Sequence, residues 1–259
     1  MIVVSIDPAP SKPAVVFDGS FTRKTACELP AFCAELSSNA ALLCWDAPLT
    51  GPPQVGGNTF GASYSQRIIE RFFSRTSTGF KAPPGISVLP YSGCPHWSIT
   101  RASLGLPRVG LYDNEDTPFR LVSGNNFERS SGQWVVESHP AVAIWLWCRD
   151  KTESSENDTW VYKGSKPSRT IEELWAKLSA KWIEANIAEI KDTIGRMDVP
   201  ADDNELDAVT GWVLGVLLAH NHPSVTVLGN EKTGAIVLPN SPLLLENFAE
   251  FCQAKDNAI

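Results

Sequence analysis

The sequence "VVSIDPAPSKPAVVFDG", residues 3–19, predicts how the chain begins its fold. An apolar run rich in β-branched residues ends at Asp7, and "AVVF" at 14–17 returns after a Pro-rich turn. Two such runs joined by turn-forming residues are typical of a β-hairpin. Asp before Pro is itself a good turn former, because its carboxylate accepts hydrogen bonds from the backbone N–H groups that follow. Taken alone, Asp7 therefore needs no functional explanation.

Strands and helices alternate along the rest of the chain. Short segments rich in β-branched or aromatic residues predict strands at 2–6, 14–17, 42–46, 133–137, 224–228 and 234–238. Apolar periodicity and capping residues predict helices at 30–38, 63–75, 96–104, 140–149, 169–193, 202–220 and 242–254. This order predicts an α/β fold whose mixed sheet opens with an antiparallel hairpin and carries helices on both faces.

Length and composition predict a single domain over residues 1–259, because 259 residues with 43% hydrophobic content bury a sizeable core. Two Gly-, Pro- or polar-rich stretches, 47–62 and 107–132, predict loop insertions. No run of about 18 uncharged apolar residues predicts a membrane span. The six cysteines form no C-x-x-C pair, which favours reduced thiols in a soluble, cytoplasmic protein.

The net charge of −7 is not what general electrostatic binding to nucleic acid predicts, since that binding needs basic surface against phosphates. If nucleic acid is the ligand, the basic residues that bind its phosphates must be concentrated in one part of the surface. The candidate substrate-binding residues are Arg67, Arg71 and Arg75, at i, i+4 and i+8 in "SYSQRIIERFFSRT". The alternative interpretation is that this row is a solvated helix face.

Acids recur where predicted strands end. Asp46 ends the strand of "ALLCWDAP" as Asp7 ends the first strand, and Glu137 ends the strand of "QWVVESHP". Ligands of largely parallel sheets gather outside the carboxyl ends of the strands. The three acids are therefore expected to project toward one shared crevice.

A further acidic group begins the predicted helix in "ADDNELDAVTGWVLGVLLAH", residues 201–220, which is too apolar to lie at the surface. Asp203, Asp207, Gly211 and Gly215 form one i, i+4 row, in which the glycines permit close approach to the sheet. An N-cap role explains Asp202 or Asp203. It does not explain Asp207, more than a turn further along.

Together these motifs resemble the ribonuclease H-like fold, in the manner of Holliday-junction resolvases. More narrowly, "SIDPAP", "CWDAPL", "VVESHPAVAIW", "ELDAVTGWV" and "GNEKTGAIVLP" resemble the predicted ribonuclease H-like nucleases called domain of unknown function 429. The resemblance spans residue 2 to about 239. It implies a catalytic metal-binding triad of Asp7, Asp46 and Asp207, with Glu137 beside it. The family pattern has an acid where this chain has Asn204, and Asp203, one position away, becomes the candidate fourth ligand.

Such a set of carboxylates suits phosphodiester hydrolysis. Two Mg²⁺ ions about 4 Å apart stabilise charge on the entering and leaving oxygens of an in-line displacement. Carboxylates without histidine or thiolate favour Mg²⁺ or Mn²⁺ over zinc. The sequence thus predicts a metal-dependent nuclease with DNA or RNA as substrate. Two alternatives stay open: a phosphotransferase of the actin-like kind, and a binding module that keeps the fold without catalysis.

Overall fold

The computed structural model describes residues 1–9, 11–50, 67–73, 82–83, 86, 96–106, 117–149, 160–164, 166–231 and 233–256. Its strands are β1 (Ile2–Asp7), β2 (Ala14–Phe17), β3 (Phe21–Lys24), β4 (Ala41–Trp45), β5 (Arg120–Leu121), β6 (Gln133–Ser138), β7 (Val225–Asn230) and β8 (Gly234–Pro239). Its helices are α1 (Leu29–Leu36), α2 (Ile68–Phe73), α3 (Trp97–Leu104), α4 (Pro140–Cys148), α5 (Ile171–Glu184), α6 (Ala188–Ile194), α7 (Asp203–Ala219) and α8 (Pro242–Asp256).

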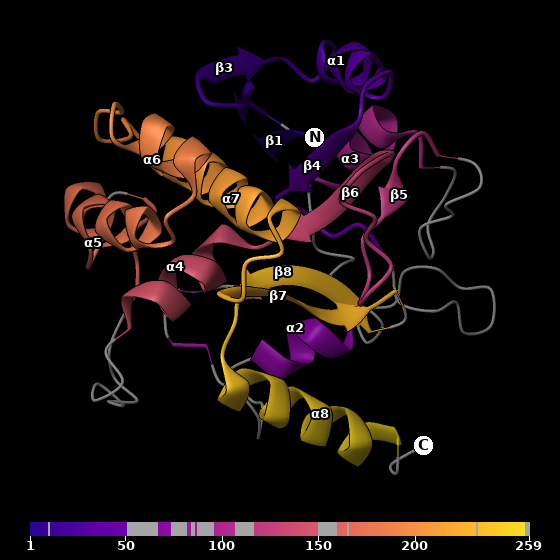
Figure 1. Cartoon of the computed structure of the whole chain (residues 1–259), viewed down its shortest axis with the longest axis vertical. Helices are drawn as coiled ribbons and strands as arrows, with labels where there is room; N and C mark the ends of the chain where they lie inside the picture. Colours follow the sequence, from indigo (N-terminus) through magenta and orange to yellow (C-terminus); the bar gives the residue numbers. More distant parts are fainter. Residues whose placement is uncertain are drawn as a thin grey trace.

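The strands form one mixed sheet in the order β3-β2-β1-β4-β6-β8-β7, with β5 paired to β6 (Figure 1). β1, β2 and β3 pair antiparallel, whereas β1–β4, β4–β6 and β6–β8 pair parallel. β7 closes the other edge antiparallel to β8. The predicted fold class is confirmed: the sheet opens with an antiparallel hairpin, has a parallel centre, and agrees with the ribonuclease H-like architecture that the motifs imply.

Each central strand sends alternate side chains to two core clusters, because successive residues of a strand point to opposite faces. One cluster holds Val3, Leu42, Cys44, Trp134 and Val136 together with the buried residues of α7. The opposite cluster holds Val4, Ile6, Leu43, Trp45 and Val135 together with residues of α1 and α3. Helices thus cover both faces, as predicted, and the residue parity within each strand tells which face a side chain meets.

The long helix α7 lies directly on the sheet, against β1, β2 and β4, with α4 and α5 beside it (Figure 1). Two glycines permit this approach. A Cβ on Gly211 would overlap Ser5 Oγ, and a Cβ on Gly215 would overlap Cys44 Sγ. The prediction that small residues bring this helix close to the sheet is confirmed.

Helix termini follow local chemistry. Asp202 is the N-cap of α7, where its carboxylate accepts a 2.9 Å hydrogen bond from the Glu205 N–H. Thr170 and Glu173 form a capping box at the start of α5. The single helix predicted over 169–193 is wrong, because the chain turns at Asn186, whose φ of 60° is left-handed, and divides into α5 and α6. β3 and β5 were not predicted.

The helices and the cysteines both bear on where the protein is expected to lie. Within the described ranges no helix is both long and apolar enough to cross a membrane. Cys33, Cys44 and Cys148 are buried free thiols, and burial raises the pKa of Cys33 to about 12. Buried, protonated thiols are poor nucleophiles, which agrees with a packing role for these cysteines.

Candidate functional site

Asp7 and Asp46 stand side by side at the carboxyl ends of two parallel strands. Asp7 is the last residue of β1, Asp46 follows β4, and the Asp46 N–H donates to the Ile6 carbonyl at 3.0 Å. Every second side chain of a strand lies on the same face, and Val3 of β1 and Leu42 and Cys44 of β4 face α7. Asp7 and Asp46 are an even number of residues away from these positions. The two carboxylates therefore point to the same side of the sheet, toward α7.

The direction of α7 brings Asp207 to the same place. Gly215 lies against Val3 and Cys44, whereas Gly211, one turn earlier, lies against Ser5. The helix therefore runs opposite to β1, and one further turn of about 5.4 Å toward its start leads from Gly211 to Asp207. Asp207 is almost fully buried there, beside the end of β1. The structure thus brings Asp7, Asp46 and Asp207 into one neighbourhood, which we call the acidic site.

Burial and mutual repulsion disfavour the charged forms of all three carboxyls. Burial, and next the Asp207 carboxylate, raise the pKa of Asp7 to about 7. Burial also holds the pKa of Asp46 well above its ordinary value, and the charges of Asp7 and Asp207 add to this. The pKa of Asp207 is raised by burial more than its cationic and hydrogen-bonding neighbours lower it. The acidic site therefore disfavours the charged forms of its carboxyls, and the neighbouring cations offset this only in part.

Two residues from the segment before α5 occupy the Asp207 carboxylate. The Tyr162 hydroxyl donates to Oδ1 at 2.6 Å, and the Lys163 ammonium donates to Oδ2. Burial lowers the pKa of Lys163, but Asp207, Asp46 and Asp7 raise it further, so the amine stays protonated. Lys163 is thus the cation at the centre of the acidic site.

The rim of the site carries a second lysine. Lys12, in the turn between β1 and β2, donates to Asn204 Oδ1 at 2.8 Å. Partly exposed Asp203 opens α7 and helps to raise the pKa of both Asp7 and Asp207. His96, before α3, lies within the influence of both lysines. Burial, followed by the charges of Lys163 and Lys12, lowers the pKa of its imidazole.

The donor chemistry of the acidic site suits a hard divalent cation, since its ligands are all carboxylate oxygens. The positions of these side chains in the folded protein do not suit such a cation. Among the described residues, no group of three or more His, Cys, Asp or Glu side chains is placed to hold a metal ion. Both oxygens of Asp207 are engaged by Tyr162 and Lys163. An ammonium ion pair thus stands where the sequence predicts a metal.

Glu137 does not join the three aspartates. In β6 it pairs with Trp45 of β4, whose side chain belongs to the cluster on the far side of the sheet from α7. The next residue, Ser138, faces α7, since a Cβ on Gly211 would lie 3.4 Å from Ser138 Oγ. Glu137 therefore faces the side of the sheet away from α7, although its charge still contributes to the raised pKa of Asp46.

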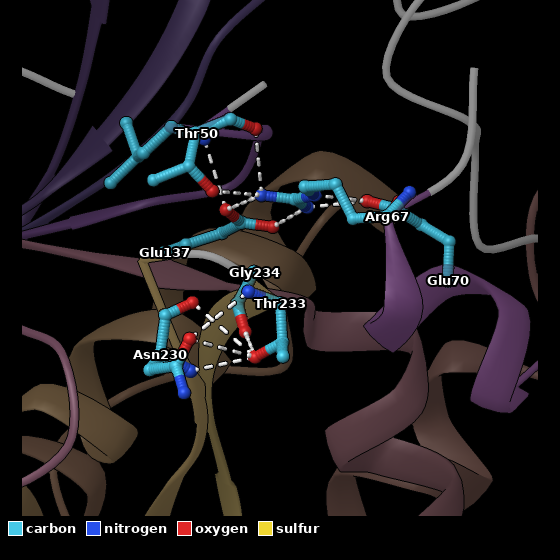
Figure 2. A network of polar contacts seen from close by, with 8 residues as sticks. Thr50, Arg67, Glu70, Glu137, Asn230, Thr233 and Gly234 are labelled. Carbon is cyan, nitrogen blue, oxygen red and sulfur yellow. Dashed lines mark hydrogen bonds and ion pairs between the residues drawn. The ribbon is translucent and has the colours of Figure 1, made fainter. Parts of the chain in front are cut away.

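Glu137 belongs instead to a second, closed cluster with Arg67, Glu70 and Thr50 (Figure 2). The Arg67 guanidinium donates to Glu137 Oε2 at 2.7 Å and Oε1 at 2.5 Å, and its Nε donates to Glu70 Oε1 at 2.6 Å. It also donates to Thr50 Oγ1 at 3.0 Å. The side chains of Arg67, Glu70 and Glu137 are each between 1% and 4% exposed. We call this group the buried arginine cluster.

The arginine row predicted from spacing is therefore broken. Arg67 precedes the first residue of α2 and points into the buried arginine cluster, so it is not a surface contact for phosphate. Arg71 lies within α2 and is exposed. Arg75 lies outside the described residues. The cations that stand at the acidic site are Lys163 and Lys12, which sequence reasoning missed together with Tyr162.

The structure places this chain in the class of mixed α/β proteins that carry carboxylates at the carboxyl ends of their parallel strands. Comparison with known proteins does not narrow this class, because no family model, no curated protein and no solved structure matches the chain. The resemblance to ribonuclease H-like nucleases therefore rests on the short motifs alone.

Proposed function

We propose that this chain is a metal-dependent phosphodiester hydrolase that acts on nucleic acid, with Asp7, Asp46 and Asp207 as its working carboxylates. The observation that carries the proposal is the convergence of Asp7, Asp46 and Asp207 beside the carboxyl ends of β1 and β4. The Asp207 charge raises the pKa of Asp7 and Asp46, and the Asp7 charge raises that of Asp46, so the charged forms of these carboxyls oppose folding. A group of this kind is typical of a site that is completed by a cation, as perturbed acids cluster at functional sites.

The chain's own residues supply position and charge. The paired backbones of β1 and β4 hold Asp7 and Asp46, and the buried Tyr162 hydroxyl orients Asp207. Bound Mg²⁺ or Mn²⁺ would supply charge stabilisation for the phosphate oxygens. Asp203 and Lys12 lie at the rim, where a polyanionic substrate would approach. Glu137 has no part in the proposal, because Arg67 binds both of its oxygens.

The test compares wild type with Asp46→Asn, using Asp192→Asn, an exposed carboxylate on α6, as the matched control. A ligand that binds only the folded state stabilises it by about 2.7 kcal/mol at one hundred times its Kd. Saturating Mn²⁺ should therefore raise the melting temperature of wild type and Asp192→Asn by about 5–10 °C. Asp46→Asn should lose most of that rise.

Cleavage of a panel of single-stranded, duplex and branched DNA and RNA, with Mg²⁺ or Mn²⁺ present, is measured on the same three proteins. Only Asp46→Asn should be inactive. Hydrolysis of ATP without cleavage of the panel would favour the phosphotransferase instead. Nucleic-acid binding with no cleavage and no Mn²⁺ response would favour the non-catalytic module.

A further inference from the structure

Basic side chains gather where the end of α4 meets α5, two helices that pack against each other (Figure 1). Lys181 of α5 donates to the Trp147 carbonyl of α4 at 3.1 Å. Burial raises the pKa of the Cys148 thiol to about 11, while the charges of Lys177, Lys181 and Arg169 act in the opposite direction, so all three cations lie around the end of α4. These three and the residue after Cys148 form what we call the basic surface: Arg149, Arg169, Lys177 and Lys181.

Both arginines of the basic surface rest on buried tryptophans. The Arg149 guanidinium lies 5.2 Å from the ring centre of Trp145, and the Arg169 guanidinium lies 4.8 Å from that of Trp160. The two tryptophans are 7% and 5% exposed. An arginine stacked on a ring is held in place by cation–π attraction, and its N–H groups lie at the edge of the guanidinium plane. A guanidinium fixed in this way matches the oxygens of a phosphate.

Positive charge is concentrated at this surface although the net charge of the chain is −7. Lys177 and Lys181 are exposed on successive turns in the middle of α5. The acids of this helix stand at its ends: Glu172, Glu173 and Glu184. Glu173 is turned back to accept from the Thr170 N–H at 3.0 Å. Cations beside the last turn of α4 also favour its dipole, but a single cation would serve that purpose.

A short segment connects the basic surface to the acidic site. Trp160 carries the Arg169 guanidinium, and the Arg169 N–H donates to the Val161 carbonyl at 3.1 Å. The next residue, Tyr162, donates through its hydroxyl to Asp207. The two sites therefore share one piece of folded backbone. An extended polyanion that lies on the basic surface is led toward the acidic site.

From this arrangement we propose that the basic surface binds the phosphate backbone of a nucleic acid and directs it to the acidic site. The inference rests on the proposed function and names the surface that the substrate occupies. An acidic protein needs its phosphate contacts to be concentrated in one place, and the basic surface meets that condition. Phosphodiesters fit it better than a bilayer does, because tryptophans buried beneath guanidiniums do not insert among lipids.

The test measures binding of fluorescent single-stranded and duplex DNA by anisotropy in excess chelator, so that the result does not depend on a metal. The double variant Lys177→Gln with Lys181→Gln should make the slope of log affinity against log salt concentration less negative by about 1.5, because each lost phosphate contact contributes about 0.7–0.9. The matched control, Lys191→Gln with Arg196→Gln, removes two exposed cations on and after α6. It should keep the wild-type slope.

A second measurement uses wild type and needs no variant. Lysine acylation by an activated ester, followed by mass spectrometry, reports which amines the bound DNA covers. Saturating DNA should slow acylation of Lys177 and Lys181 at least severalfold and leave Lys191 unchanged.

The outcomes separate the inference from the proposed function. If the Lys177→Gln, Lys181→Gln variant has the slope of its control, or DNA leaves the acylation of both lysines unchanged, the basic surface is refuted even where wild type cleaves nucleic acid. If binding in chelator shows the expected slopes and no cleavage is found, the basic surface stands and only the proposed hydrolase fails. Binding to phosphatidylserine vesicles without binding to DNA would assign the surface to a membrane and overturn the inference.

Discussion

The two carboxylate clusters of this protein use opposite arrangements. In the buried arginine cluster, Arg67 lies between Glu70 and Glu137, donates to both, and is closed to solvent (Figure 2). In the acidic site, three aspartates share one ammonium, that of Lys163, whose side chain is half exposed. The first cluster joins residues 70 positions apart in the chain. The second has three carboxyls whose charged forms burial disfavours.

The choice of cation explains this difference. Arg67 presents a planar fork of donors that matches two carboxylates at once and cannot lose its proton, whereas Lys163 is a point charge on a flexible stem. Burial lowers the pKa of Arg67, but the charges of Glu137 and Glu70 raise it further still. A buried, multiply bonded cation fixes structure, and a single-contact, half-exposed cation can be exchanged. The first cluster therefore has the features of a structural ion-pair network, whereas the second is the site of the proposed function.

The largest effect is expected from Arg67→Met. The variant leaves Glu70 and Glu137 buried without their cation, and removal of one partner from a buried ion pair costs about 3–5 kcal/mol. Urea unfolding at pH 7 should show a loss of this size in the free energy of unfolding. Arg71→Met, an exposed arginine on α2, should lose less than about 1 kcal/mol. Equal losses in the two variants would contradict the structural role of the buried cluster.

A smaller effect is expected from the acidic site, measured as the pH dependence of the free energy of unfolding in chelator. Its cause is a carboxyl whose charge opposes folding, whereas the charges of the buried arginine cluster support folding. Because the pKa of Asp7 rises from 3.8 to about 7 on folding, the folded protein binds more protons than the unfolded chain between these values. Stability from this group is thus present at low pH and is lost as pH rises from about 4 to 7. The loss is on the order of a few kcal/mol.

Asp7→Asn removes this titrating group and should flatten the stability profile over that pH range, as measured by urea unfolding at pH 4 to 8. Asp192→Asn should keep the wild-type slope. In chelator at pH 7 the Asp7→Asn variant should be more stable than wild type, since one repelling charge is gone. A wild-type profile that rises with pH across this window would contradict the repulsion within the acidic site.

Much of the acidic site could be predicted from the sequence, because its signals are local. The apolar runs before Asp7 and Asp46 predict strands, and equal parity within parallel strands predicts one shared face. The i, i+4 row of Asp207, Gly211 and Gly215 predicts which side of α7 meets the sheet. Each of these inferences depends only on the period of a helix or a strand.

The rest depends on contacts between distant parts of the chain. The face of Glu137 depends on its register with Trp45, which no pattern within β6 reveals. Lys163 and Tyr162 reach Asp207 across 44 and 45 residues, from a segment without helical or strand periodicity. Arg67 breaks the apparent arginine row because α2 begins one residue later.

The smallest effect concerns whether α2 contacts nucleic acid in addition to the acidic site. With Arg67 buried, Arg71 is the exposed arginine of the predicted row that the structure describes. Each phosphate contact contributes about −0.9 to the slope of log affinity against log salt concentration, so Arg71→Ala should make the slope less negative by about one. Arg196→Ala, an exposed arginine after α6, is the matched charge control and should leave the slope unchanged. Equilibrium binding of duplex DNA or RNA between 50 and 200 mM salt, roughly the range over which phosphate contacts dominate the change in affinity, gives the slopes. A slope in Arg71→Ala equal to that of Arg196→Ala would place Arg71 with solvated surface charge. Substrate contact at the acidic site would then rest with Lys12, at the rim of that site.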